Sequence, residues 1–235
     1  MAGNRYPIPG RNSPVAARSR RRDFVELAVA YALILLVIWT PRPWQKLLWW
    51  VAAAAIAAFA STSFEGFQAM GLRRKNFLRS LWIVGLALLV AAVAVLLAAR
   101  LHTLRPPGSL IQFIDKYWAY ALWASVQQFL LQCFFLSRLL RLLPRAKLAA
   151  VVAAAIFAAA HLPNPILMPV TLLWGLASCL LFLRYRNLYA LAMAHAILGI
   201  TIAITVPGPV DHNMRVGLGY LTYAHEHGTT NSPQP

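Results

Sequence analysis

The sequence predicts an all-α protein, a polytopic bundle of transmembrane helices. Of its 235 residues, 60% are hydrophobic and only 12% are charged, and the mean hydropathy is +0.61. This composition lies outside that of soluble domains, and the apolar runs are long enough to cross the roughly 30 Å hydrocarbon core of a bilayer. The runs lack the alternation of barrel strands, and lipid offers no partner to backbone N–H and C=O groups, so the spans must be helical.

About seven spans can be assigned, and an eighth partial span is left open. Together they predict one membrane domain at residues 23–206. A basic tail at 1–22 and a second tail at 207–235 flank this domain, and their polar composition predicts flexibility. The expected spans cover about 24–40, 44–60, 78–99, 117–140, 147–162, 166–183 and 187–206.

The net charge of +16 comes from 22 Lys and Arg against six acids. In a soluble domain this excess would indicate nucleic acid, but here the basic residues lie between apolar segments, so no nucleic-acid partner is expected. The N-terminal tail carries six of them, and the loops after the second, fourth and sixth spans carry four, four and two. The opposite side carries six. The positive-inside rule then predicts a cytoplasmic N-terminus in a multi-pass protein of the bacterial cytoplasmic (inner) membrane.

A few polar side chains fall inside the expected spans: Gln127, Gln128, Gln132, His161 and His195. Helical geometry places Gln128 and Gln132 on one face, with Gln127 about 100° away. Counted at roughly 1.5 Å per residue, Gln128 and the two histidines lie within several ångströms of the bilayer middle. Any one of these Gln or His side chains alone is typical of a hydrogen bond between membrane helices. Three helices with polar groups at one depth predict a shared site.

Two short motifs add to this pattern. Phe157 and His161 form Phe-x-x-x-His, and His195 follows in LYALAMAHAILG. In this order and spacing the chain resembles the CPBP family, the CAAX protease and bacteriocin-processing (Abi) proteins, which include the type II CAAX prenyl endopeptidases. The resemblance runs from about 66 to 200 and is strongest from 120 to 200.

The chain departs from the family's Glu-Glu-x-x-x-Arg motif, because three neutral amides stand at the charged positions. Gly199 likewise stands where the family often has Asn. In the family a glutamate is thought to activate the attacking water, with the histidines supporting the water and the oxyanion. The resemblance implies catalytic positions at His161, His195, Gln127 and Gln128, and a cavity lined by Gln132, Phe157 and Gly199.

An amide cannot accept a proton as a carboxylate does, so glutamate-based hydrolysis is expected to be impaired or lost. Glu65, near the cytoplasmic end of the second span, is the only carboxylate near the working half of the membrane domain, and exposure at a helix end is its simpler interpretation. A neutral histidine is an alternative base. Two histidines without a carboxylate or cysteine lack the usual third metal ligand, so no metal site is predicted and the cofactor is left unknown.

Three functions remain open on these residues. The first is an intramembrane endopeptidase that cleaves membrane-anchored or lipidated peptides through His161 and His195. The second is a non-catalytic binding or scaffold protein, a pseudoprotease that holds a hydrophobic peptide, prenyl chain or partner helix. The third, a transporter or accessory subunit, has no supporting motif, since inverted repeats and broken helices are not evident. The expected partners are membrane lipids and a hydrophobic or lipidated peptide.

Overall fold

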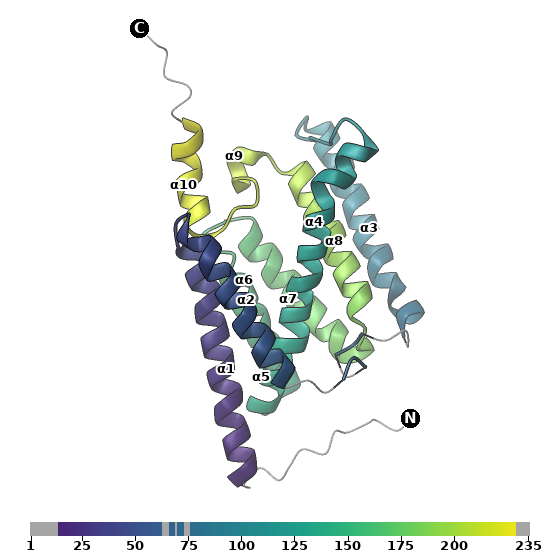
Figure 1. The fold of residues 1–235 in the computed structure, drawn as a ribbon. Helices are drawn as coiled ribbons and strands as arrows, with labels where there is room; N and C mark the ends of the chain where they lie inside the picture. The colour runs from purple at the N-terminus through teal and green to yellow at the C-terminus, as the bar shows by residue number, and fades with distance from the viewer. Residues whose placement is uncertain (1–13, 63–65, 69, 73–75, 229–235) are drawn as a thin grey trace.

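The computed structural model describes residues 14–62, 66–68, 70–72 and 76–228, and helix is the only regular structure within these ranges. Figure 1 shows the long helices packed side by side and alternating in direction. The all-α prediction is therefore confirmed. The elements are α1 (Pro14–Trp39), α2 (Trp44–Thr62), α3 (Phe77–Arg100), α4 (Leu110–Phe129), the π-helix η1 (Leu130–Leu136), α5 (Ser137–Leu142), α6 (Ala146–Ala159), α7 (Leu167–Tyr185), α8 (Leu188–Thr205), α9 (Gly208–Asp211) and α10 (Gly217–Gly228).

Four helices in the described part of the chain are long and apolar enough to cross a membrane: α3, the continuous helix Leu110–Leu142, α7 and α8. The shorter α6 is also apolar. Helices α1 and α2 lie at the positions of the first two expected spans. Neither is among the four helices that are both long and apolar enough to cross a membrane. The membrane helix bundle is confirmed, and the count of seven spans stays a prediction.

Helical structure extends past the expected domain limits of 23 and 206. Helix α1 begins at Pro14, because the basic stretch before Asp23 continues the same helix. After α8, the short α9 and the longer α10 lie at the upper end of the bundle, where α10 contacts α1 (Figure 1). Gly217 N–H donates to Leu162 O at 2.8 Å and fastens the start of α10 to the turn after α6.

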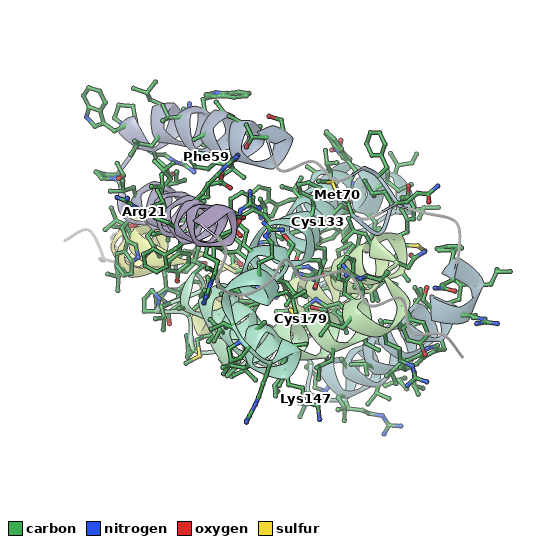
Figure 2. The ribbon with its side chains drawn as sticks, turned by 90° about the horizontal axis from the view of Figure 1, so that it is seen from below. Arg21, Phe59, Met70, Cys133, Lys147 and Cys179 are labelled. Atoms are coloured by element: carbon green, nitrogen blue, oxygen red, sulfur yellow. The ribbon has the colours of Figure 1, made fainter. Side chains whose placement is uncertain are left out.

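Basic residues gather at the lower end of the bundle in Figure 1, which we call the basic end. Figure 2 looks at the molecule from this side and shows Arg21 on α1 and Lys147 at the start of α6. Arg79 at the start of α3 and Arg184 at the end of α7 belong to the same end. This distribution is the one on which the predicted orientation depends, and the orientation itself stays a prediction.

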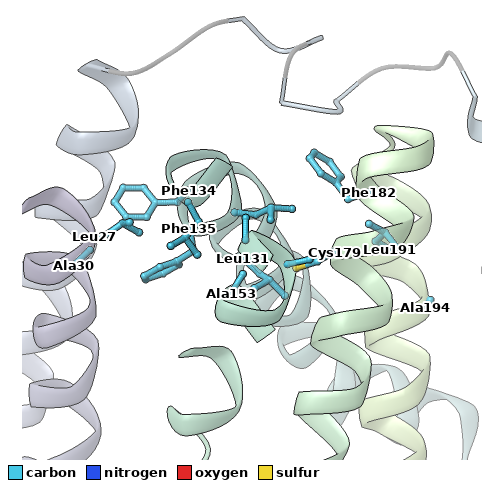
Figure 3. Close-up of a cluster of buried hydrophobic side chains, with 14 of the residues drawn as sticks. Leu27, Ala30, Leu131, Phe134, Phe135, Ala153, Cys179, Phe182, Leu191 and Ala194 are labelled. Carbon is cyan, nitrogen blue, oxygen red and sulfur yellow. The ribbon is translucent and has the colours of Figure 1, made fainter. Parts of the chain in front are cut away.

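Small residues bring α6 and α7 close together. Ala149, Ala150, Ala153 and Ala154 are fully buried, and a methyl group added at Gly175 would lie 3.3 Å from the Ala154 Cα. Such close approach is how helices associate in lipid, where no hydrophobic force draws them together. Figure 3 shows hydrophobic side chains of the same core, and those that it labels come from α1, η1, α6, α7 and α8. Its labelled residues are Leu27, Ala30, Leu131, Phe134, Phe135, Ala153, Cys179, Phe182, Leu191 and Ala194.

Two buried acids fasten α1 to the end of the long central helix. Arg138 donates to Glu26 Oε2 through Nη2 at 2.6 Å and through Nε at 2.9 Å. Arg141 binds both carboxylate oxygens of Asp23 at 2.8 Å. These contacts account for two of the six acids in the sequence, so they supply structure at the basic end and no acid to the site described next.

Candidate functional site

The helix that carries the three glutamines changes its winding in the middle. From Leu130 to Leu136 it is a π-helix, whose wider turns place one more residue in each hydrogen-bonded ring. Gln128 precedes this segment and Gln132 lies in it, and both side chains are completely buried, at 0% exposure. Such π turns inside α-helices frequently occur at functional sites.

The two buried amides form a chain of hydrogen bonds that joins three helices. Gln132 Nε2 donates to Gln128 Oε1 at 3.2 Å and to Ser178 Oγ on α7 at 3.1 Å. Gln128 Nε2 lies 3.2 Å from His195 Nδ1 on α8. Ser178 in turn donates to Gly175 O at 3.1 Å. The amides therefore bind one another and hold His195 in place, which offsets part of their burial cost in an apolar bundle. Gln132 Oε1 is buried without a partner among the described residues.

These contacts assign the tautomers of the two histidines. The amide NH₂ of Gln128 can only donate, so His195 Nδ1 accepts and its proton resides on Nε2. His161 Nδ1 lies 2.7 Å from Phe157 O, a carbonyl that can only accept, so His161 carries its proton on Nδ1. His195 thus has Nε2–H to donate, whereas the lone pair of His161 Nε2 accepts no hydrogen bond from the described residues.

Both histidines line a pocket of about 620 Å³ between α4, α7, α8 and the segment 213–216. Gln127 and Gly199 line it as well. Lys116, on α4, is the one Lys or Arg among the described lining residues, and none of those residues is Asp or Glu. Across the described residues as a whole, no group of three or more His, Cys, Asp or Glu side chains forms an arrangement that could hold a metal ion.

The remaining residues expected at the site lie one layer behind the pocket wall. Gln128 and Gln132 are fully buried, because their amides are bound to His195 and Ser178. Phe157, expected to line the cavity, instead packs its ring against both imidazoles, with centroids 4.8 Å from His161 and 6.0 Å from His195. Glu65, considered as a substitute acid, lies outside the described residues.

Gly199 allows a close approach of α4 to α8. A Cβ at this position would collide with the hydroxyl and the ring of Tyr120, which also lines the pocket. The tyrosine ring therefore fills the space that a larger side chain would need on α8. Contact with Tyr120 therefore explains why a glycine stands at position 199, where the family often has Asn.

Three contributions to the site were missed by sequence reasoning. Trp174 lines the pocket with its ring 6.1 Å from that of His195, and its buried Nε1–H has no acceptor among the described residues. Tyr120 lies seven residues before Gln127, a spacing that places both on one helix face and that could have indicated it. The pocket residues Asn213 and Met214 follow the last expected span and carried no such signal.

Apolar helices around buried Gln and His side chains that meet at one pocket define an integral membrane protein with a polar site inside the bundle. Residues 117–201 match the model of the family described as Type II CAAX prenyl endopeptidase Rce1-like. This match confirms the resemblance to the CPBP family over the segment from α4 to α8, which contains all seven residues expected at the site. The comparisons with curated proteins and with solved structures gave no match.

Proposed function

We propose that this CPBP-like membrane protein of the bacterial inner membrane binds a hydrophobic or lipidated peptide in the pocket and does not hydrolyse it through a carboxylate. One observation carries the proposal. The amides of Gln128 and Gln132 use their N–H groups to bind His195 and Ser178, and no acid lines the pocket among the described residues.

The pocket offers groups that suit a peptide backbone. His195 Nε2–H is a donor for a carbonyl oxygen, and the Gln127 amide both donates and accepts. Tyr117, Trp123 and Leu198 supply apolar and aromatic surface. A volume of about 620 Å³ is in the range of small-ligand sites and accepts a few side chains or part of a lipid chain.

The same groups lack a component of ordinary hydrolysis. Attack of water on a peptide carbonyl needs a group that takes the water proton, and in the related enzymes a glutamate is thought to do so. The Gln127 amide can orient water in the pocket but cannot accept its proton, and Gln128 is buried behind the pocket wall. Binding therefore remains while carboxylate-based cleavage is lost.

The test measures peptide binding and peptide cleavage in the same protein preparation. Purified protein is incubated with a farnesylated peptide that carries a photoreactive group, and crosslinking and the intact mass of the peptide are followed together. We expect crosslinks at pocket residues and an unchanged peptide mass. Gln127→Leu removes the amide that lines the pocket and keeps a side chain of similar size, and it should weaken crosslinking. Turnover of the peptide by the wild-type protein would contradict the proposal.

A second candidate, hydrolysis with His161 as the base, is favoured by the tautomers. His161 Nε2 is free to accept a proton from water, and His195 Nε2–H can donate to the carbonyl oxygen. In this case wild type cleaves the peptide, and His161→Ala abolishes cleavage. His102→Ala, a change of an exposed histidine after α3, is the matched control and should cleave at the wild-type rate.

A further inference from the structure

A second pocket, of about 430 Å³, lies at the basic end, away from the histidines. It is lined by Asn76 and Arg79 at the start of α3 and by Arg184 and Tyr185 at the end of α7. We propose that this pocket binds the phosphate headgroup of an anionic phospholipid. The proposal is independent of the peptide site.

The pocket has a defined geometry, because hydrogen bonds from two residues hold Tyr185 in place. Asn76 Nδ2 donates to Tyr185 O at 3.1 Å, and Trp82 Nε1 donates to the Tyr185 hydroxyl at 3.2 Å. The Trp82 and Tyr185 rings meet edge to face, with centroids 6.3 Å apart. The hydroxyl is thus an acceptor toward Trp82, and its own proton has no acceptor among the described residues, so it can donate to a ligand oxygen.

The charge of the pocket selects an anion. Its lining contains two arginines and no acid, and within the described ranges neither Arg79 nor Arg184 forms an ion pair. Arg184 lies over the Tyr185 ring, with its Cζ 5.4 Å from the centroid. Arginine presents a planar set of N–H donors that fits phosphate oxygens, and basic pockets between membrane helices bind lipid headgroups.

The surface next to the pocket indicates a lipid rather than free phosphate. Trp82, Leu86 and Leu89 are 49%, 50% and 61% exposed. They recur at intervals of four and three residues, so they form one outward face of α3. This apolar stripe leads from the pocket toward the middle of the helix. A phosphate at Arg79 would therefore place its acyl chains along a surface that is already apolar, with Trp82 and Tyr185 at headgroup depth.

The experiment measures lipid retention by native mass spectrometry of the full-length protein in detergent. Dioleoyl phosphatidylglycerol is compared with dioleoyl phosphatidylcholine, which has the same chains and a zwitterionic headgroup. We expect wild type to retain phosphatidylglycerol preferentially. The double variant Arg79→Gln/Arg184→Gln should weaken this retention about tenfold or more, because each basic side chain contributes to anionic-lipid attraction.

Two further variants separate this effect from general loss of charge or of folding. Arg145→Gln/Lys147→Gln removes the same charge from exposed positions at the basic end and should retain phosphatidylglycerol as wild type does. Arg79→Lys/Arg184→Lys keeps the charge and should recover much of the preference. Equal retention of the two lipids by wild type, or an unchanged preference in the Gln variant, would overturn the proposal. Binding of inorganic phosphate without retention of phosphatidylglycerol would also overturn it.

Discussion

Gln128 Nε2 lies 3.2 Å from His195 Nδ1, so an amide holds the imidazole from inside the bundle. The contact does more than join two helices. It assigns the proton of His195 to Nε2, because the amide NH₂ of Gln128 donates to Nδ1. The polar groups around His195 are therefore neutral donors and acceptors.

The first prediction concerns this contact. Gln128→Leu leaves the buried Nδ1 of His195 without a partner, and it should lower the free energy of unfolding by about 1–3 kcal/mol. Thermal unfolding in detergent measures the loss, and ¹⁵N chemical shifts of labelled histidine should show a changed tautomer. Gln127→Leu, a change at the adjacent amide that lines the pocket, should stay within about 0.5 kcal/mol of wild type. Equal effects of the two variants would refute the role given to Gln128.

The second prediction tests the fit between Gly199 and Tyr120. Gly199→Ala should cost about 1–3 kcal/mol of stability, because the new methyl group collides with the tyrosine. In the double variant with Tyr120→Ala the space is free, so the cost of the alanine should largely disappear. Gly85→Ala is the control, since no atom lies within 4 Å of the added methyl group. It should be neutral or slightly stabilising in its helix. Additive effects at 199 and 120 would exclude the collision.

Much of the fold and part of the site could be predicted from the sequence. Apolar runs indicate membrane helices because lipid leaves the backbone no alternative, and costly polar residues at one depth indicate a shared site. Three of the residues predicted in this way, His161, His195 and Gln127, line one pocket. It could not place Gln132 behind the wall, because a π-helical turn is a local change of winding that apolar periodicity does not reveal.

Residues outside the apolar runs were harder to predict. Asn213 and Met214 reach the pocket because the chain turns back after α8, where Asn164 Nδ2 donates to Asp211 O at 2.7 Å and to Arg215 O at 3.0 Å. Such a turn depends on single hydrogen bonds between segments about 50 residues apart. Hydropathy carries no information about them.

The third prediction concerns the ion pairs of α1. Glu26→Gln leaves Arg138, whose side chain is 1% exposed, without its counter-charge, and it should cost about 3 kcal/mol or more. Asp23→Asn should cost less, about 1 kcal/mol, because the Arg141 side chain is 35% exposed and can turn to water. Chemical denaturation in mixed micelles compares the two variants. A larger loss from Asp23→Asn would contradict this ranking.

The last prediction uses Asp211, which follows the last long helix. The residue is 1% exposed, and its Oδ1 accepts from the Asn213 backbone N–H at 3.0 Å, while Oδ2 has no partner among the described residues. Burial raises the pKa of this carboxyl, and the backbone N–H groups of Asn213 and Met214 and the charge of Arg105 oppose the rise only in part. An acid whose pKa is higher in the folded chain binds its proton more tightly there. Folded stability therefore falls as the pH rises from the ordinary aspartate range through the raised pKa of Asp211.

Asp211→Asn stays neutral and keeps an oxygen for Asn213, so this variant should melt at a higher temperature than wild type near neutral pH. The difference in melting temperature should shrink as the pH is lowered. Asp211→Ala, which loses the acceptor, should be less stable than Asp211→Asn throughout. Melting curves between about pH 4 and pH 8 test this, and a lower melting temperature for Asp211→Asn at neutral pH would show that the carboxylate stabilises the turn.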